Sequence, residues 1–283
     1  MVIFKKVSDL QKFISLYGKG GHDIGFVPTM GALHKGHISL IQKSKKENKL
    51  TLACIFVNPT QFNDPKDYEK YPVTIENDIE LLEEAGCDLL FLPDVREIYP
   101  AGTRQERKYD LGYLETVLEG EFRPGHFQGV CMVIERLLTI IKPHQLYLGR
   151  KDYQQCMVIK KLTELIGLDK IVKVRICPTL REKDGLAMSS RNMRLNDEER
   201  KTATVIYKAL QNIKETIRKG NTQTVTNNAK KRLSENGFKP DYVEIADAAN
   251  LQLINDWDGE RKIVALIAAF LNGVRLIDNM ELN

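Results

Sequence analysis

Short apolar segments alternate with helix-length amphipathic segments along the first 177 residues of the chain. Residues 50–57 form the clearest apolar segment, a continuous run that is typical of a strand buried on both faces of a sheet. Strands that alternate with helices of this length indicate right-handed βαβ units and a mostly parallel sheet. This part of the chain is therefore expected to fold as an α/β domain, a Rossmann-like parallel sheet with helices on both faces.

The expected elements can be placed from apolar spacing and from glycine and proline stops. The expected strands are residues 24–27, 50–57, 88–92, 145–148 and 171–177. The expected helices are residues 8–17, 37–48, 74–85, 127–141 and 153–166. A parallel sheet of this type binds its ligands at the carboxyl ends of the strands, so the loops that follow four of the strands are the places to look for a site.

The pattern changes at about Pro178. Two polar, lysine-rich stretches at residues 197–218 and 222–236 are expected to be helical. They are followed by strand candidates, and Asn272-Gly273 between the last two is a strong hairpin signal. The strand candidates are residues 241–246, 262–270 and 274–280. We therefore expect a boundary between residues 179 and 180, with a small C-terminal α+β domain at 180–283.

Charge and composition exclude several classes of protein. The chain has 42 Lys and Arg against 38 Asp and Glu, a net charge of +4, and its lysine-rich stretches also contain acids. Such a mild excess does not hold nucleic acid by counterion release. The longest apolar run, residues 263–271, is far shorter than the roughly 20 residues of a membrane-spanning helix. No signal-peptide-like stretch opens the chain, and the five widely spaced cysteines lack a CxxC pair, which favours free thiols in a reducing, cytoplasmic setting.

The first candidate loop, which we call the histidine loop, is Pro-Thr-Met-Gly-Ala-Leu-His-Lys-Gly-His at residues 28–37. His34 and His37 are three residues apart on the opening turn of an expected helix, so both rings can face the same way. That turn is expected to present unpaired backbone N–H groups, and Gly36 to let a phosphate approach. Imidazoles there can donate hydrogen bonds to charge that grows on a transferring phosphoryl group. A structural or zinc-binding histidine pair is the alternative, although no third ligand lies nearby in the sequence.

The second candidate, the lysine loop, is Gly-Arg-Lys-Asp-Tyr-Gln-Gln at residues 149–155, again at a strand end that opens a helix. Lys151 can place a point charge on a phosphate, and Asp152 can cap the helix or bind a ribose hydroxyl. Alternatively, the two residues are a solvated ion pair in a tight turn.

The third candidate, the serine loop, is Asp-Gly-Leu-Ala-Met-Ser-Ser-Arg-Asn at residues 184–192. Two hydroxyls followed by an arginine suit a loop that closes over a triphosphate, although a helix-capping loop would look the same. Three such loops at three strand ends together predict an adenylate-forming enzyme.

With further motifs, these loops resemble the pantoate–β-alanine ligase family of the HxGH nucleotidylyl-transferase superfamily. The further motifs are FVNPTQF at 56–62, YP at 71–72 and RPGHFQGV at 123–130. The resemblance is dense over residues 24–195, and beyond them it rests on RLIDN at 275–279. It implies that ATP, pantoate and β-alanine give pantothenate, AMP and pyrophosphate through an enzyme-bound pantoyl-adenylate. It also implies Mg²⁺ and a homodimer, with the small-molecule substrates as the other partners and with neither nucleic acid nor a membrane among them.

The resemblance also implies roles for individual residues. His37, His34 and Lys151 are the expected catalytic residues. Gln61 and Gln155 are expected to bind pantoate, with Asn58 facing the same crevice, and Asp78 is expected to be linked to magnesium or else to be an ordinary first-turn helix acid. The expected ATP contacts are Met30, Gly31, Ala32, Leu33, His34, Lys35, Gly36, His37, Gly149, Arg150, Lys151, Asp152, Leu180, Met188, Ser189, Ser190 and Arg191.

Other polar residues of these motifs receive different interpretations. Arg150 departs from the family pattern and either adds charge beside the phosphates or points outward. Arg123 and His126 are interpreted as structural, and His22 and His144 receive no role. Residues 1–179 are expected to bind nucleotide and pantoate, while 180–283 act as a lid that keeps water from the adenylate.

Two rival functions remain at this point. Another HxGH nucleotidylyltransferase would attack with a phosphate group, and its acceptor site should carry cations where this chain has Gln61 and Gln155. A non-catalytic RNA- or partner-binding protein is suggested by the isoelectric point of about 8.6. Against it, the lysine-rich stretches are interspersed with acids, which is typical of a solvated helix face.

Overall fold

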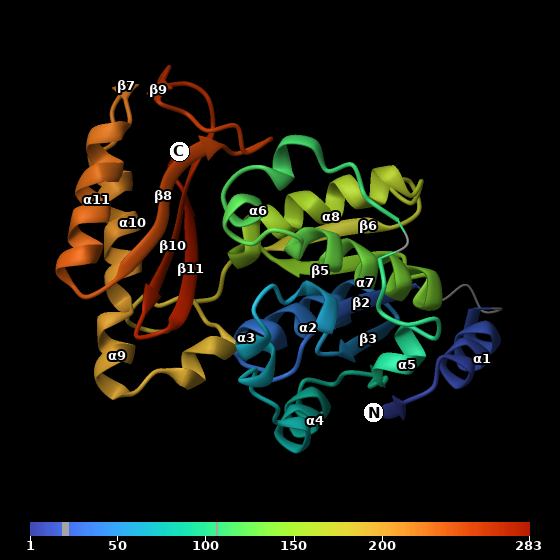
Figure 1. Cartoon of the computed structure of the whole chain (residues 1–283). Helices are drawn as coiled ribbons and strands as arrows, with labels where there is room; N and C mark the ends of the chain where they lie inside the picture. Colours follow the sequence, from blue (N-terminus) through green and yellow to red (C-terminus); the bar gives the residue numbers. More distant parts are fainter. Residues whose placement is uncertain (19–22, 106) are drawn as a thin grey trace.

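Six parallel strands form the central sheet, in the order β1-β4-β3-β2-β5-β6. They are seen in a computed structural model that describes residues 1–18, 23–105 and 107–283 (Figure 1). The strands are β1 (Val2–Phe4), β2 (Ile24–Thr29), β3 (Leu50–Ile55), β4 (Leu89–Phe91), β5 (Gln145–Gly149) and β6 (Lys173–Cys177). The predicted parallel α/β sheet is confirmed. The edge strand β1 was not predicted, because three residues are too few to show a pattern.

Helices cover both faces of this sheet, as predicted. On β3, Leu52 and Cys54 pack into one core cluster while Ala53 and Ile55 pack into another, the alternation that a strand imposes. The first cluster holds α1 (Val7–Gly18), α7 (His126–Ile141) and α8 (Tyr153–Leu165), and the second holds α2 (Lys35–Glu47) and α4 (Ile75–Glu84). Short helices lie in the connections: α3 (Pro65–Glu69), α5 (Val95–Ile98) and α6 (Glu119–Phe122).

A second, antiparallel sheet lies in the C-terminal part, in the order β11-β10-β8. Its strands are β8 (Lys239–Asp247), β10 (Ile263–Leu271) and β11 (Val274–Glu281), and a two-residue pair, β7 (Gly220–Asn221) with β9 (Asp256–Trp257), lies beside it. Asn272 and Gly273 have positive φ angles of 44° and 78°, as a tight hairpin turn requires. The predicted hairpin is therefore confirmed.

The continuous apolar run of β10 is explained by burial on both faces. Alternate residues, such as Ile263 and Ala265, pack against the C-terminal helices, whereas Val264 and Leu266 pack against Leu118 and Tyr153 of the N-terminal part. The C-terminal helices are α9 (Asp197–Thr202), α10 (Thr204–Thr216) and α11 (Gln223–Glu235). Figure 1 shows α10 and α11 on the side of this sheet away from the parallel sheet. The predicted boundary between residues 179 and 180 stays a prediction.

Two other predictions concern the character of the chain. Cys54, Cys87, Cys131, Cys156 and Cys177 are all free and buried, as expected. Within the described ranges, none of the helices combines the length and the apolar character needed to cross a membrane.

Candidate active site

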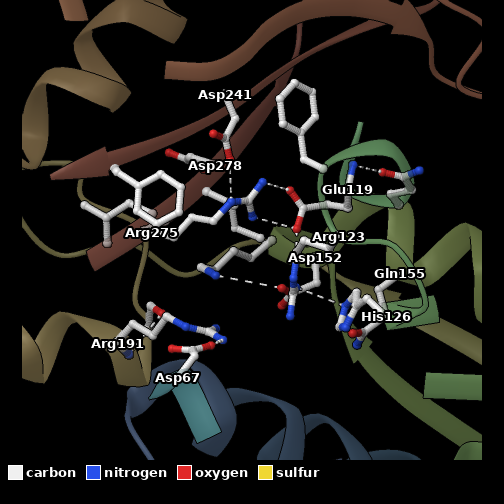
Figure 2. Close-up of a pocket in the computed structure, with 18 of the residues that line it drawn as sticks. Asp67, Glu119, Arg123, His126, Asp152, Gln155, Arg191, Asp241, Arg275 and Asp278 are labelled. Atoms are coloured by element: carbon white, nitrogen blue, oxygen red, sulfur yellow. Dashed lines mark hydrogen bonds and ion pairs between the residues drawn. The ribbon is translucent and has the colours of Figure 1, made fainter. Parts of the chain in front are cut away.

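Two adjoining cavities open at the carboxyl ends of the parallel strands. The histidine cavity, of about 210 Å³, is lined by the histidine loop, the lysine loop and the serine loop. The interdomain cavity, of about 370 Å³, lies between the parallel sheet and the C-terminal sheet (Figure 2). The residues that line both cavities are Met30, Gln61, Lys151, Asp152, Gln155, Ser189 and Arg191. These shared residues mark the place where two bound molecules could meet.

A buried carboxylate, that of Asp78, holds the histidine loop in place. Asp78 of α4 accepts hydrogen bonds from the backbone N–H of Ala32 at 2.9 Å, from that of Leu33 at 2.7 Å and from the Thr74 hydroxyl at 3.0 Å. These contacts fix a strained turn, because Gly31 and Ala32 have φ angles of +80° and +49°. Asp78 is fully buried and lines neither cavity, which favours a structural role; the link to magnesium stays a prediction.

The two histidines of the loop cap the helix that follows. α2 begins at Lys35, two residues earlier than expected, with His34 as its N-cap. Nδ1 of His34 accepts from the Gly36 N–H at 3.1 Å, and Nδ1 of His37 accepts from the His34 N–H at 3.4 Å. The rings stack with their centroids 4.0 Å apart. The expected shared orientation is confirmed, and the backbone N–H groups of Ala32, Leu33 and Gly36 are already hydrogen-bonded within the protein.

The capping contacts set the proton positions on these rings. An Nδ1 atom that accepts a backbone N–H cannot carry a proton, so each neutral ring carries its proton on Nε2. Burial, with the Lys151 cation nearby, lowers the pKa of His34 to about 4. Burial, with His34 and Lys151, lowers the pKa of His37 well below its ordinary value. Near neutral pH the pair therefore consists of two uncharged Nε2–H donors.

Gly36 lines the histidine cavity, where its expected role toward a phosphate stays a prediction, and it also has a structural role. A Cβ at this position would lie 2.8–2.9 Å from the ring atoms of His34. The missing side chain thus makes room for the histidine ring itself, which can then fold back over the helix turn to make its capping contact.

The lysine loop follows β5 as a single 3₁₀ turn, Arg150–Asp152, that leads into α8. Lys151 lines both cavities, and its side chain is 16% exposed with Asp152 at 3.9 Å. Arg150 lines neither cavity and instead forms an ion pair with Glu281 of β11 at 2.6 Å. The side chain of Arg150 thus lies as the outward interpretation expects, and its ATP contact stays a prediction.

The serine loop is fastened to the histidine loop. The Ser190 hydroxyl donates to the Ala32 carbonyl at 3.0 Å, and the Ser189 hydroxyl accepts from the Arg191 N–H at 3.3 Å. Arg191 and Arg194 both pair with Asp67 of α3, at 2.8 Å each. Figure 2 shows Arg191 and Asp67 together on one wall of the interdomain cavity. The pairing brings this loop against the segment that carries Gln61.

Gln61 is held on three sides. Its side-chain oxygen accepts from Asn58 at 3.1 Å, its side-chain nitrogen donates to the sulfur of Met30 at 3.1 Å, and its carbonyl accepts from Nδ1 of His126 at 2.7 Å. Asn58 is 1% exposed, and its amide also bonds Gly129, Thr60 and Tyr99. Asn58 therefore supports Gln61 while also lining the histidine cavity, and its expected contact with substrate stays a prediction.

Gln155 lines both cavities, and its expected contact with pantoate stays a prediction. Its neighbour Gln154 is 2% exposed and bonds the backbone of Leu114, Val117 and Glu119. Gln154 lines the interdomain cavity alone, whereas Gln155 lines both cavities, because adjacent residues on a helix point about 100° apart. An apolar wall of the histidine cavity was not predicted from the sequence. It comes from one face of α7 and consists of Val130, Val133, Ile134 and Leu137. The spacing of three and four residues could have revealed this wall, although a helix that packs on a sheet has the same pattern.

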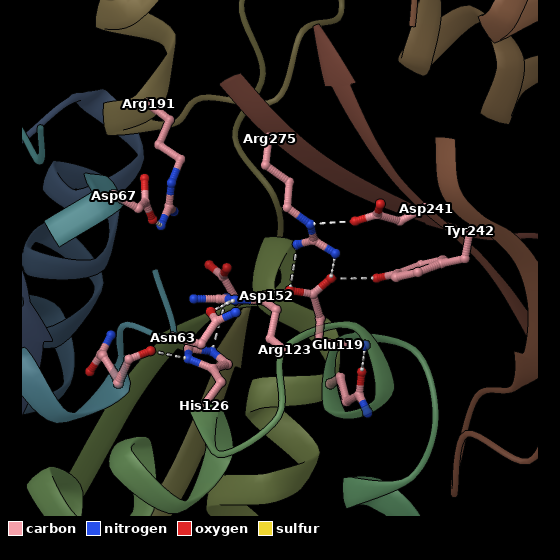
Figure 3. Close-up of polar contacts among 12 residues, drawn as sticks. Asn63, Asp67, Glu119, Arg123, His126, Asp152, Arg191, Asp241, Tyr242 and Arg275 are labelled. Carbon is pink, nitrogen blue, oxygen red and sulfur yellow. Dashed lines mark hydrogen bonds and ion pairs between the residues drawn. The ribbon is translucent and has the colours of Figure 1, made fainter. Parts of the chain in front are cut away.

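A buried ion-pair network closes the interdomain cavity (Figure 3). Glu119 accepts from both terminal nitrogens of Arg275 at 2.7 and 2.8 Å, from Tyr242 at 2.9 Å and from Arg123 at 3.4 Å. Burial alone would raise the pKa of Glu119, but Arg275 and Arg123 outweigh it and hold the pKa at about 2. Arg275 also bonds Asp241 at 2.7 Å. Glu119 was not predicted from the sequence, because a single acidic residue outside a recognised motif does not indicate a functional role.

The structural interpretation of Arg123 and His126 is supported by their contacts. Nη1 of Arg123 donates to Nε2 of His126 at 3.1 Å, and burial lowers the pKa of His126 to about 3. His144, which was given no role, accepts from the Ile24 N–H at 3.2 Å and lines neither cavity. His22 lies outside the described residues.

The expected ATP contacts divide into two groups. Most line the histidine cavity: Met30, His34, Gly36, His37, Gly149, Lys151, Asp152, Leu180, Met188, Ser189, Ser190 and Arg191. The others line neither cavity; they are Gly31, Ala32, Leu33 and Lys35 of the histidine loop, and Arg150 of the lysine loop. As for metals, the described part of the chain contains no cluster of three or more His, Cys, Asp or Glu that could hold one.

The fold and these loops together define the class of the protein. A parallel sheet whose strand ends carry the paired histidines, the lysine loop and the serine loop is the arrangement of the HxGH nucleotidylyl-transferase enzymes. Within that class the chain belongs to the pantoate–β-alanine ligase family, whose model matches residues 2–281.

Individual relatives agree with this assignment. The chain is 44% identical to the pantothenate synthetase of Cytophaga hutchinsonii, over 99% of both chains. The crystal structure of pantothenate synthetase from Thermus thermophilus matches with a TM-score of 0.90 at 38% identity, covering 100% of this chain and 99% of that one. Pantoate–β-alanine ligase from Francisella tularensis, in complex with β-γ ATP and β-alanine, matches with a TM-score of 0.82 at 39% identity, covering 99% and 97%.

Proposed function

We propose that this protein condenses pantoate with β-alanine, using ATP and releasing AMP and pyrophosphate through a bound pantoyl-adenylate. The observation that carries the proposal is the pair of adjoining cavities, which meet at Lys151, Gln61 and Gln155 in a member of this ligase family. A reaction that first joins a nucleotide to an acid and then brings in an amine needs two such compartments with one common junction.

ATP is proposed to occupy the histidine cavity. Nε2–H groups of His34 and His37 would donate to the phosphates, and Lys151 and Arg191 would neutralise their charge. The two uncharged histidines and the two cations together would stabilise the negative charge that develops on the leaving pyrophosphate. The Francisella ligase, whose structure contains β-γ ATP and β-alanine, supports ATP as a substrate.

Pantoate is proposed to lie at the junction between Gln61 and Gln155. Its two hydroxyl groups and its carboxylate can be oriented by neutral amides, which leave the carboxylate nucleophilic. Its two methyl groups match the apolar wall of α7. Asn58 and His126 serve by holding Gln61 in place.

The first step then needs positioning more than acid–base chemistry. A carboxylate oxygen of pantoate, already ionised, attacks the α-phosphorus of ATP. The bond from that phosphorus to the bridging oxygen breaks, and pyrophosphate leaves with the electron pair. Mg²⁺ is proposed to arrive with ATP, where it neutralises phosphate charge; the described residues contain no cluster of three or more His, Cys, Asp or Glu that could hold it by themselves.

The second step uses the interdomain cavity. The unprotonated amine of β-alanine attacks the acyl carbon, AMP leaves with the former carboxylate oxygen, and the amine proton passes to solvent. We propose that β-alanine enters through this cavity and that residues 180–283 limit the access of water to the adenylate. A homodimer and a cytoplasmic location complete the proposal, the latter supported by five buried free thiols.

The rival nucleotidylyltransferase function is not favoured. A phosphate acceptor would require cations of its own, but the two cations at the junction, Lys151 and Arg191, are assigned to the ATP phosphates. The acceptor is then left with the neutral side chains of Gln61 and Gln155, in a member of the pantoate–β-alanine ligase family.

Pyrophosphate release tests the proposal. Enzyme with ATP, Mg²⁺ and pantoate should release about one equivalent of pyrophosphate, and β-alanine should then start continuous turnover. If pantoate elicits no release while a sugar phosphate or nucleotide does, the proposed substrate is wrong.

A further inference from the structure

The RLIDN segment of β11, residues 275–279, belongs to the C-terminal sheet but directs its polar side chains to the N-terminal part and the serine-loop region. Arg275 bonds Glu119, and Asp278 accepts two hydrogen bonds from Arg181 at 2.6 and 3.0 Å. Asn279 contacts the lysine loop, which carries Lys151. Its Nδ2 donates to the carbonyl of Arg150 at 3.0 Å and to that of Lys151 at 2.7 Å. One amide thus holds two successive peptide groups of the lysine loop.

Asn279 is itself fixed, and only 5% of its surface is exposed. Its N–H donates to Asp278 at 2.8 Å, and its carbonyl accepts from Arg181 at 3.1 Å. A donor whose own backbone is held in this way can act as a rigid reference point for the loop it contacts.

The lysine loop needs such an external support. It is a single 3₁₀ turn, and such turns have poor internal hydrogen-bond geometry. The Lys151 ammonium lies 3.9 Å from Asp152, a long ionic contact with its own neighbour, so its position depends on the backbone that carries it. Glu281, on the same strand as Asn279, provides a second contact to this loop, a 2.6 Å ion pair with Arg150.

We propose that Asn279 is a positioning residue, which places the Lys151 ammonium at the junction of the two cavities by holding the carbonyls of residues 150 and 151. The inference rests on the proposed function in one respect, the contact between Lys151 and the ATP phosphates. It gives the C-terminal sheet a direct part in adenylate formation, beyond covering the site.

The test variant is Asn279→Asp, which keeps the shape but replaces two N–H donors by a carboxylate that faces two carbonyls. Asn283→Asp is the matched control. Asn283 follows the same strand, and its Nδ2 donates to one carbonyl, that of Arg261, at 3.0 Å, away from both cavities. Asn279→Ala, which removes the donors without adding charge, serves if the Asp variant does not fold.

We expect Asn279→Asp to weaken binding of a non-hydrolysable ATP analogue about tenfold by calorimetry. It should slow pantoate-dependent pyrophosphate release at least tenfold, while Asn283→Asp matches the parent. The KM for β-alanine should stay within twofold, because Lys151 acts on the phosphates. A structural role alone would lower the folded fraction and leave nucleotide affinity unchanged.

A double-mutant cycle supplies the decisive comparison. If Asn279 acts through Lys151, then Lys151→Ala with Asn279→Asp should bind the analogue no more weakly than Lys151→Ala alone. Additive losses, or an Asn279 variant with parental affinity, would overturn the inference. If the parent binds ATP but pantoate elicits no pyrophosphate, the proposed function fails, and the binding cycle still decides the role of Asn279.

Discussion

Replacing Asp78 by Asn should damage the histidine loop at nearly constant volume. The buried carboxylate of Asp78 accepts two backbone N–H groups and one hydroxyl. An amide can offer one oxygen and must turn its NH₂ group toward another donor. Hydrogen bonds to charged groups contribute about 1.5–3 kcal/mol each, and an unsatisfied buried donor costs about 1–3 kcal/mol. We therefore expect a loss of about 3 kcal/mol in the free energy of unfolding, or roughly 6 °C in Tm.

The same variant should also lose catalysis, because His34 and His37 follow directly from the strained turn that Asp78 holds. Thermal unfolding by circular dichroism and pantoate-dependent pyrophosphate release measure the two effects, and the second should fall at least tenfold. Asp94→Asn is the matched control. Asp94 is an exposed helix cap with two backbone N–H partners, a position where Asn caps about as well as Asp.

A magnesium role for Asp78 would give the opposite pattern. Asp78→Asn would then keep its Tm but require a much higher Mg²⁺ concentration for half-maximal activity. That outcome would refute the structural role assigned to this carboxylate.

Three further predictions follow from the site. First, the pKa of His34 in the folded protein, about 4, lies below the ordinary value of 6.5, so the unfolded chain binds a proton more readily. The free energy of unfolding should therefore fall as the pH drops from about 6.5 toward 4, by at most about 1.4 kcal/mol per pH unit from this group. Measured against pH, the Tm of His34→Gln should fall less steeply than that of the parent. Second, Gly36→Ala would place a Cβ 2.8 Å from the His34 ring, so pyrophosphate release should fall more than tenfold, whereas the exposed Lys46→Ala on the same helix should leave it unchanged. Third, Arg275→Met should lower the free energy of unfolding by about 3–5 kcal/mol, because the buried charge of Glu119 loses its partner. Adding Glu119→Gln to this variant should restore part of the lost stability. A loss of less than about 2 °C in the Tm of Arg275→Met would contradict this prediction.

The sheet and the loops could be predicted because they depend on local signals. Apolar runs and glycine stops located five of the six parallel strands, and the hairpin at Asn272 and Gly273 followed from turn chemistry. β1 escaped because three half-exposed residues at an edge, Val2–Phe4, carry no periodicity. The split between α9 and α10 at Ala203 was missed since no glycine or proline marks it.

The supporting contacts of the site could not be predicted, because they join residues far apart in the chain. Asp78 and Ala32 are 46 positions apart, and Asn279 and Lys151 are 128 apart. The helical spacing of His34 and His37 predicted that the rings face together, but it did not show that they cap α2 and consume its first N–H groups. Motif residues therefore located the site, while the geometry that prepares them depends on partners without a motif.

The most direct test of the adenylate mechanism follows one oxygen atom. Pantoate labelled with ¹⁸O in its carboxylate is incubated with enzyme, ATP, Mg²⁺ and β-alanine, and the products are analysed by mass spectrometry. The mechanism predicts one ¹⁸O atom in each AMP and none in pyrophosphate, because the oxygen that attacks the α-phosphorus stays with AMP when the amide forms. Unlabelled AMP, or label in released phosphate, would contradict it.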